Sequence, residues 1–145
     1  MKEIINKLQS TTFQSTHLTN DRLKYLANLA QITEDHVSRI GLAISISHGR
    51  VNPKWLPNNL ENEVSILDAI GKEKHIRSKT LLKDDLPTWL ALILQNQNPG
   101  DYNSWRNILR AHWERGVEIL MAKSFNNNDW IRIIEDCFKS KKALI

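Results

Sequence analysis

The stretch that decides the fold begins Thr12-Phe-Gln-Ser-Thr-His-Leu18 and continues as two apolar repeats to His48. Its first seven residues favour an extended strand, because β-branched and aromatic side chains suit a pleated chain. Thr19 has the position of a helix N-cap, and apolar residues then recur at helical spacing to about Gln31. Thr33 caps a second predicted helix, which ends at His48. The pattern predicts the order strand, helix, short turn and helix.

The rest of the chain is predicted to be helical between short breaks. Prolines and asparagines make residues 49–59 a loop, and a short helix is expected from Leu60 to Ile70. A helix that starts at Asp84 or Asp85 has almost no polar face, so it should be central in the fold or covered by a partner subunit. The longest helix is expected over residues 102–123, and a last helix follows residues 126–128.

The composition of the chain limits the classes of protein to which it can belong. The chain has 145 residues, of which 41% are hydrophobic and 25% charged, and its net charge is +4. These values are typical of one globular domain, and the helical pattern above makes it mainly α. The break at residues 126–128 separates a helical domain over residues 1–125 from a C-terminal helical extension over residues 126–145. At most six helices and one strand are expected. The sequence has no long apolar run for a membrane span and no signal peptide pattern, so a cytoplasmic protein is expected.

The basic segment, Gly71-Lys-Glu-Lys-His-Ile-Arg-Ser-Lys-Thr-Leu-Leu-Lys83, is the clearest functional signal. It holds five Lys or Arg residues against the single acid Glu73, with hydroxyl groups interleaved. Ammonium and guanidinium groups donate strong hydrogen bonds to phosphate oxygens, and hydroxyls add neutral ones. The segment therefore indicates phosphate binding, although a solvated lysine-rich loop would have the same composition.

Catalytic and metal-binding patterns are absent from the sequence. The five histidines are scattered, and a single cysteine, Cys137, lies on an apolar helix face, where it is expected to be a buried hydrophobe. His112 is the one polar ring in the long apolar stripe and is expected to be a satisfied core or interface residue. No phosphate-binding glycine loop or nucleophile elbow occurs. We therefore expect a protein that is not an enzyme and that has no cofactor or metal.

Three blocks of the sequence resemble one known family. They are residues 22–45, residues 71–82, and Ala111-His-Trp-Glu-Arg-Gly-Val-Glu-Ile-Leu120, and their order and spacing cover roughly residues 12–122. Together they are similar to DndE, the small E subunit of bacterial DNA phosphorothioation (DNA sulfur modification) systems. The resemblance implies a cytoplasmic DNA-binding subunit with an Arc-like strand-helix-helix element. It also implies a homotetramer that favours nicked duplex DNA and works beside the other subunits, without doing the sulfur chemistry itself.

Under this hypothesis, basic residues contact the DNA backbone without reading its sequence. The expected contacts are Lys72, Lys74, Arg77 and Lys79, with Arg39, Arg50 and Lys54 as outer ones. Four neutralised phosphates predict a slope of about −3.6 for log K against log salt. The oligomer interface is expected to include Trp89, His112, Trp113 and Gly116, because apolar helices and five tryptophans are generous for a chain of 145 residues.

Two other functions fit the same residues. The protein could be an assembly adaptor whose basic segment pairs with an acidic partner subunit. It could also be a ribbon-helix-helix transcriptional regulator, in which a strand pairs with its twin from another subunit and residues 14–17 enter the major groove. An ordinary edge arm that covers a helical core is a structural alternative to that strand.

Overall fold

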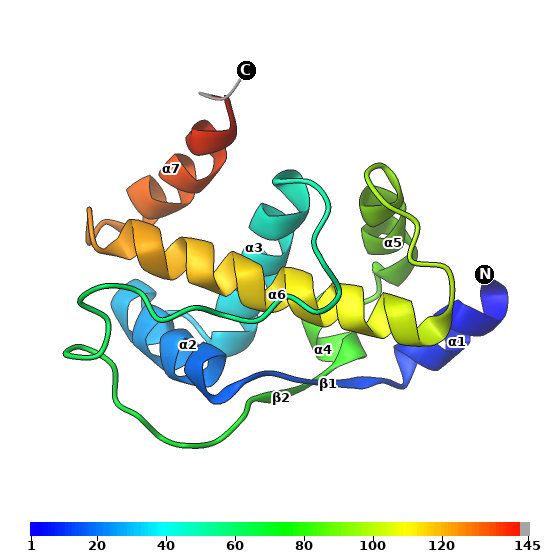
Figure 1. The fold of residues 1–145 in the computed structure, drawn as a ribbon, viewed down its shortest axis with the longest axis horizontal. Coiled ribbons are helices and arrows are strands. Elements are labelled where there is room, and N and C mark those ends of the chain that lie inside the picture. The colour runs from blue at the N-terminus through cyan, green and yellow to red at the C-terminus, as the bar shows by residue number, and fades with distance from the viewer. Residues whose placement is uncertain (143–145) are drawn as a thin grey trace.

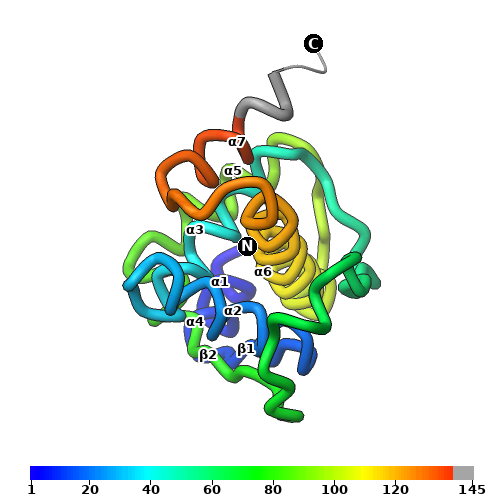
Figure 2. Tube along the Cα trace, turned by 90° about the vertical axis from the view of Figure 1, so that its left-hand side faces the viewer, coloured from blue at the N-terminus to red at the C-terminus, as the bar shows by residue number. Residues whose placement is uncertain are grey.

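The computed structural model describes the backbone of residues 1–142 and the side chains of residues 1–138, and its described part is mainly helical (Figure 1). The helices are α1 (Lys2–Gln9), α2 (His17–Ala30), α3 (Glu34–Ser47), α4 (Ser78–Leu82), α5 (Leu86–Leu94), α6 (Tyr102–Ser124) and α7 (Trp130–Lys142), and the strands are β1 (Thr12–Gln14) and β2 (His75–Arg77). The long helix α6 runs through the middle of the molecule, and α1, α2, α3 and α7 pack against it (Figures 1 and 2). Residues 1–142 contain seven helices and two strands, against the six helices and one strand expected: α1, α4 and β2 were not predicted, and the helix predicted over residues 60–70 is absent.

Helix α6 is the centre of the core, as its apolar stripe predicts. Trp105 and Trp113 are completely buried on it. Helix α3 crosses α6 at the two glycines, Gly41 and Gly116. A Cβ atom on Gly116 would lie only 1.7 Å from the carbonyl oxygen of Gly41, so the two backbones meet here without side chains between them. Gly116 therefore allows a close approach between two helices of one chain, α3 and α6.

Capping residues set where the helices begin. Thr33 caps α3 as predicted, with its Oγ1 3.2 Å from the backbone N–H of His36. The predicted cap of α2 is wrong by three residues: Thr16 caps this helix, and Thr19 donates its backbone N–H to the Thr16 hydroxyl. The extended stretch is consequently shorter than expected and ends as a strand at Gln14.

Strand β1 pairs with β2 of the same chain in an antiparallel two-stranded ribbon, which we call the β1–β2 ribbon. The register sets Thr12 opposite Arg77, Phe13 opposite Ile76 and Gln14 opposite His75. The order strand, helix, helix over residues 12–47 is confirmed. The basic segment 71–83 thus contains the residues that lead into β2, the strand β2 itself and the short helix α4.

Two predicted elements differ from the structure. Residues 60–70 form turns and irregular chain instead of a helix, because Glu63 points inward to a buried arginine while Val64, expected on the apolar face, is 84% exposed. Helix α5 exists where predicted but lies at the periphery. It buries Leu86, Leu90 and Ile93 and leaves Leu92 and Leu94 exposed, so it is not central.

The described part of the predicted C-terminal extension is helix α7, which packs against α6 and α3. Ile133 and Cys137 are buried at this contact, and the ring of His48 lies 3.0 Å from the carbonyl oxygen of Cys137. Residues 143–145 of the extension lie outside the described residues. No helix in the described part of the chain is long and apolar enough to cross a membrane.

Candidate nucleic-acid interface

The four basic residues expected to bind phosphate have different surroundings in the structure. Lys72, Arg77 and Lys79 are exposed, and no carboxylate lies within 4 Å of them among the described side chains. The ammonium of Lys74 is half-buried and lies 3.4 Å from Glu34 and 3.7 Å from Asp35. These two acids neutralise Lys74, so three of the four cations remain open to an external anion.

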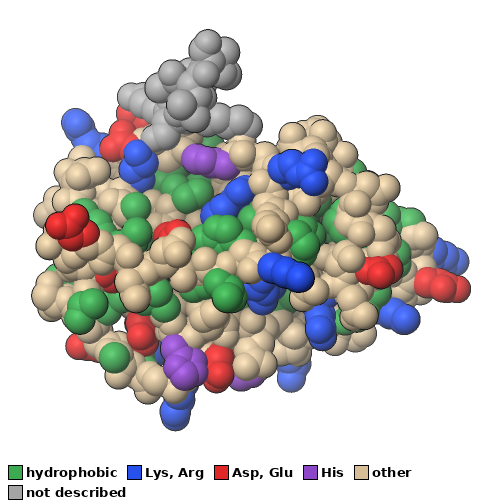
Figure 3. Space-filling model, in the orientation of Figure 1, with side chains coloured by type: hydrophobic (Ala, Val, Ile, Leu, Met, Phe, Trp, Pro, Cys, Tyr) green, Lys and Arg blue, Asp and Glu red, His purple; other side chains and the backbone are tan. Residues whose placement is uncertain are grey.

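The predicted outer contacts are dispersed over other elements. The Arg39 guanidinium donates to the carbonyl oxygens of Thr80 and Leu81, so it holds the end of α4. Arg50 and Lys54 are exposed on the segment that crosses α6, and they are on neither β2 nor α4. The cationic surface therefore centres on the β1–β2 ribbon and the start of α4. Figure 3 shows Lys, Arg and His side chains along the lower edge of the molecule, with acidic side chains among them.

A polar hollow of about 420 Å³ opens beside Arg77 and Lys79. It is lined by the end of α1, the start of β1 and these two cations: Asn6, Gln9, Ser10, Thr11, Thr12, Arg77 and Lys79. No carboxylate is part of this lining, in which residues with amide and hydroxyl groups accompany the two cations. Such a set of donors suits an anion with several oxygens, such as a phosphate. The sequence did not predict that residues of α1 line this hollow, because residues 1–9 carry no functional signal.

A larger hollow of about 690 Å³ lies at the other end of the ribbon, next to Gln14. Its walls include the apolar side chains of Leu18 and Leu56, the carboxylate of Glu73, and Arg110 paired with Glu114. Hydrogen bonds from its own backbone and from the His17 ring, 3.2 Å away, lower the pKa of Glu73 and favour its ionised form. A phosphate would meet a negative charge there, so the Arg77 end is the better anion site.

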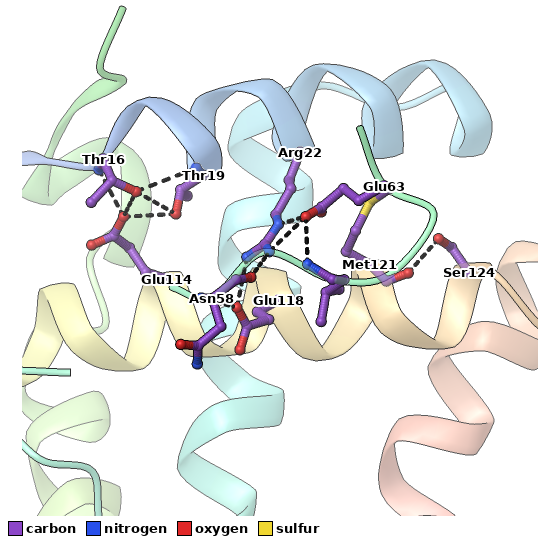
Figure 4. Close-up of polar contacts among 10 residues, drawn as sticks. Thr16, Thr19, Arg22, Asn58, Glu63, Glu114, Glu118, Met121 and Ser124 are labelled. Atoms are coloured by element: carbon purple, nitrogen blue, oxygen red, sulfur yellow. Dashed lines mark hydrogen bonds and ion pairs between the residues drawn. The ribbon is translucent and has the colours of Figure 1, made fainter. Parts of the chain in front are cut away.

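A buried polar network fixes the chain that leads into the basic segment (Figure 4). The Arg22 guanidinium, fully buried on α2, donates to both carboxylate oxygens of Glu63 and to Glu118 on α6. It also donates to the backbone carbonyl of Asn58, whose N–H in turn donates to Glu118 at 2.7 Å. Asn20 donates to the carbonyl oxygen of Lys72 at 2.9 Å. Side chains of α2 therefore hold the irregular segment in place up to the first basic residue.

Helix α6 supplies a second set of anchors for this region. Glu114, fully buried, accepts hydrogen bonds at 2.6–2.7 Å from the backbone and hydroxyl of Thr16 and from the hydroxyl of Thr19 (Figure 4). Arg110 pairs with Glu114 and donates to two backbone carbonyls of residues 53–55. Arg115 donates to the backbone carbonyls of residues 49 and 50. These contacts attach both the start of α2 and the loop after α3 to one rigid helix.

Three of the residues expected at an oligomer interface lie inside the subunit. His112 and Trp113 are 1% and 0% exposed, and Gly116 is buried against Gly41. These three positions have no free surface for a second copy, so the expectation is corrected: they build the core between α3 and α6. Trp89 on α5 is partly exposed and donates its indole N–H to the carbonyl oxygen of Leu82.

His112 is a satisfied core histidine. Its Nδ1 lies 2.8 Å from the hydroxyl of Ser45, which already accepts a hydrogen bond from Arg115. This contact gives the buried ring a hydrogen-bond partner at Nδ1, whichever of the two groups donates. Burial, aided by the positive charge of Arg115, lowers the pKa of His112 to about 3.

Cys137 is confirmed as a buried side chain, and burial raises the pKa of its thiol to about 11. At that value the thiolate, which is the nucleophilic form, is scarce at neutral pH. Among the described residues, no group of three or more His, Cys, Asp or Glu side chains is placed to hold a metal ion.

Comparisons with protein families, with curated proteins and with solved structures find no match to this chain. The candidate site is therefore defined by its own residues: three exposed cations on or beside the β1–β2 ribbon, a polar hollow next to two of them, and a buried network that holds the segment in place.

Proposed function

We propose that the protein is a non-catalytic subunit that binds duplex DNA through backbone phosphates. The observation that carries the proposal is the pair Arg77 and Lys79, exposed beside a polar hollow that no carboxylate lines. The resemblance to DndE supports the same function and extends it: the subunit would position DNA for the other members of a cytoplasmic phosphorothioation complex and would favour nicked duplex. A preference for a nick would come from the greater flexibility of the duplex there.

The number of open cations sets the expected salt dependence. Lys72, Arg77 and Lys79 have no acidic partner among the described side chains, whereas Lys74 does. If each open cation neutralises one phosphate, log K falls with log salt at a slope of about −2.7 per subunit. This value is shallower than the −3.6 expected from four contacts. An oligomer that engages several subunits on one duplex would steepen the slope in proportion.

The oligomer is part of the proposal. The resemblance implies a homotetramer, and α5 offers apolar surface for a subunit contact. Leu92 and Leu94 are 39% and 40% exposed on this helix, and Trp89 is partly exposed next to them. Apolar and aromatic side chains of this kind are typical of the centre of protein interfaces. The same surface favours the second candidate function, an assembly adaptor for partner subunits.

Fluorescence anisotropy with intact and nicked duplexes of one sequence, over a salt series, tests the proposal. We expect binding with a slope near −2.7 or a multiple of it, and tighter binding to the nicked duplex. Arg77→Glu should abolish binding on every sequence. The matched control is Arg132→Glu, which changes the charge equally on α7, far from the ribbon (Figure 1), where the Arg132 side chain is 72% exposed.

No binding at low salt would refute direct DNA recognition and leave the adaptor function. An equal loss in Arg77→Glu and Arg132→Glu would show that overall charge, and not the ribbon, governs the affinity. Tight binding to one operator only, with the strand of one subunit paired to its twin, would favour the ribbon-helix-helix regulator.

A further inference from the structure

The β1–β2 ribbon separates its side chains cleanly between two faces. Phe13 and Ile76, opposite each other in the register, are 2% and 3% exposed and belong to the core. The residues on either side of them in both strands are exposed. Because side chains alternate along a strand, these four residues share the outward face. They are Thr12, Gln14, His75 and Arg77, and each of them can form hydrogen bonds.

The hydrogen-bond pattern brings these outward side chains close together in pairs. The backbone N–H of Ser78 donates to the carbonyl oxygen of Thr11, and the backbone N–H of Ser15 donates to the carbonyl oxygen of Lys74, both at 2.9 Å. By the alternation of an antiparallel ladder, the pairs in between, Thr12–Arg77 and Gln14–His75, are not hydrogen-bonded through the backbone. In such pairs the Cα atoms are about 4.5 Å apart and the side chains lie nearest to each other. The ribbon therefore presents two adjacent polar pairs.

The dimensions of this face match the major groove of DNA. Two residues along a strand span about 6.7 Å, which is close to two base-pair steps of about 3.4 Å. The major groove is about 12 Å wide and admits a two-stranded ribbon. Figures 1 and 2 both place the ribbon at one edge of the molecule, where it can approach a duplex.

The chemistry of the four side chains is that of base-edge recognition. An arginine binds guanine O6 and N7 through two hydrogen bonds, and a glutamine binds adenine N6 and N7 in the same way. Arg77 and Gln14 lie on opposite strands and in different pairs, so they would address base pairs about two steps apart. Lys79 and the amides of the polar hollow, beside Arg77, are placed for the adjacent phosphate.

We propose that the outward face of the β1–β2 ribbon reads base edges in the major groove, with Gln14 and Arg77 as the main readers and Thr12 and His75 in support. This inference rests on the proposed DNA binding and adds sequence preference to it: Arg77 contacts phosphate on random DNA and a guanine on a preferred sequence. It differs from recognition by a strand paired between two subunits, because both strands of the reading surface come from one chain.

Selection of duplexes from a randomised pool by the full-length protein, followed by sequencing, tests the inference. We expect an enriched motif that contains an adenine and a guanine about two base-pair steps apart. Gln14→Ala should lose the adenine preference, with about a tenfold weaker affinity for the selected duplex and little change for random DNA. Gln95→Ala is the matched control, because Gln95 is also exposed but follows α5.

The outcomes separate this inference from the function on which it rests. Binding without any enriched motif, or an enriched motif that Gln14→Ala leaves unchanged, would overturn base reading and leave backbone binding in place. Absence of binding to every duplex at low salt would overturn both. Gln14 is exposed and its side chain is outside the core, so its replacement is not expected to affect folding.

Discussion

Replacement of Gly116 by alanine should disrupt the crossing of α3 and α6. The added Cβ atom would lie 1.7 Å from the carbonyl oxygen of Gly41, 2.2 Å from its carbonyl carbon and 2.8 Å from its Cα. All three atoms belong to a helix backbone, which cannot move away as a side chain can. Ordinary contact begins near 3.4 Å, so the nearest gap would have to double.

The energetic effect follows from what such a separation exposes. Overpacking a core costs about 1–3 kcal/mol and more where the neighbours are rigid. Moving the two helices apart would also loosen the packing of Trp113 and Val117, both fully buried on α6. Alanine gains about 1 kcal/mol over glycine in helix propensity, which is too little to compensate. We expect Gly116→Ala to lower the free energy of unfolding by at least about 3 kcal/mol, a large share of the 5–15 kcal/mol typical of a domain.

Gly41→Ala is a matched control on the facing helix. Its Cβ atom would lie 3.1 Å from the backbone nitrogen of Val117, a contact that a shift of a few tenths of an ångström relieves. The gain in helix propensity should offset most of that strain, so we expect a change within about 1 kcal/mol.

Urea denaturation followed by tryptophan fluorescence measures both variants. With a slope of about 2 kcal/mol per molar urea, Gly116→Ala should lower the midpoint by about 1.5 M or leave the chain unfolded. Midpoints that are equal for the two variants, or a Gly116→Ala variant as stable as the unchanged chain, would refute the close approach of α3 and α6.

Two further predictions concern the buried polar groups. Because burial lowers the pKa of His112 from 6.5 to about 3, the unfolded chain takes up a proton near pH 6.5 that the folded chain does not. The free energy of unfolding should therefore fall by about 1.4 kcal/mol per pH unit as the pH is lowered from about 6.5 towards about 3, and urea titrations at several pH values should show this part of the slope vanish in His112→Gln. Arg22→Met would leave Glu63, which is buried, and Glu118, which is half-buried, without a cationic partner, with an expected loss of about 3–5 kcal/mol and faster proteolysis of the segment around Glu63. The double variant Arg22→Met, Glu63→Met should recover part of that loss, and full additivity of the two replacements would contradict a shared ion pair.

Much of the helical framework could be predicted from the sequence, because the signals involved are local. The cap at Thr33 and the apolar stripe of α6 depend on residues three or four positions apart, and the structure has both. The same holds for α5, whose start after Asp85 was predicted, although its place at the periphery was not. The basic segment was also recognisable from composition alone, and its exposed members are open to an external anion.

Pairings between distant residues were decided only by the tertiary structure. The ion pair of Arg22 with Glu63 joins positions 41 residues apart, and it holds residues 60–70 as irregular chain where local periodicity predicted a helix. Glu34 neutralises Lys74 from 40 residues away, which removes one of four expected phosphate contacts. Residues 75–77 have only a weak sequence preference for a strand, and they form β2 because β1 pairs with them. Local spacing determines which residues share a helix face, but which faces and charges meet depends on how the chain closes on itself. That closure is governed by burial and by the need of every buried charge for a partner.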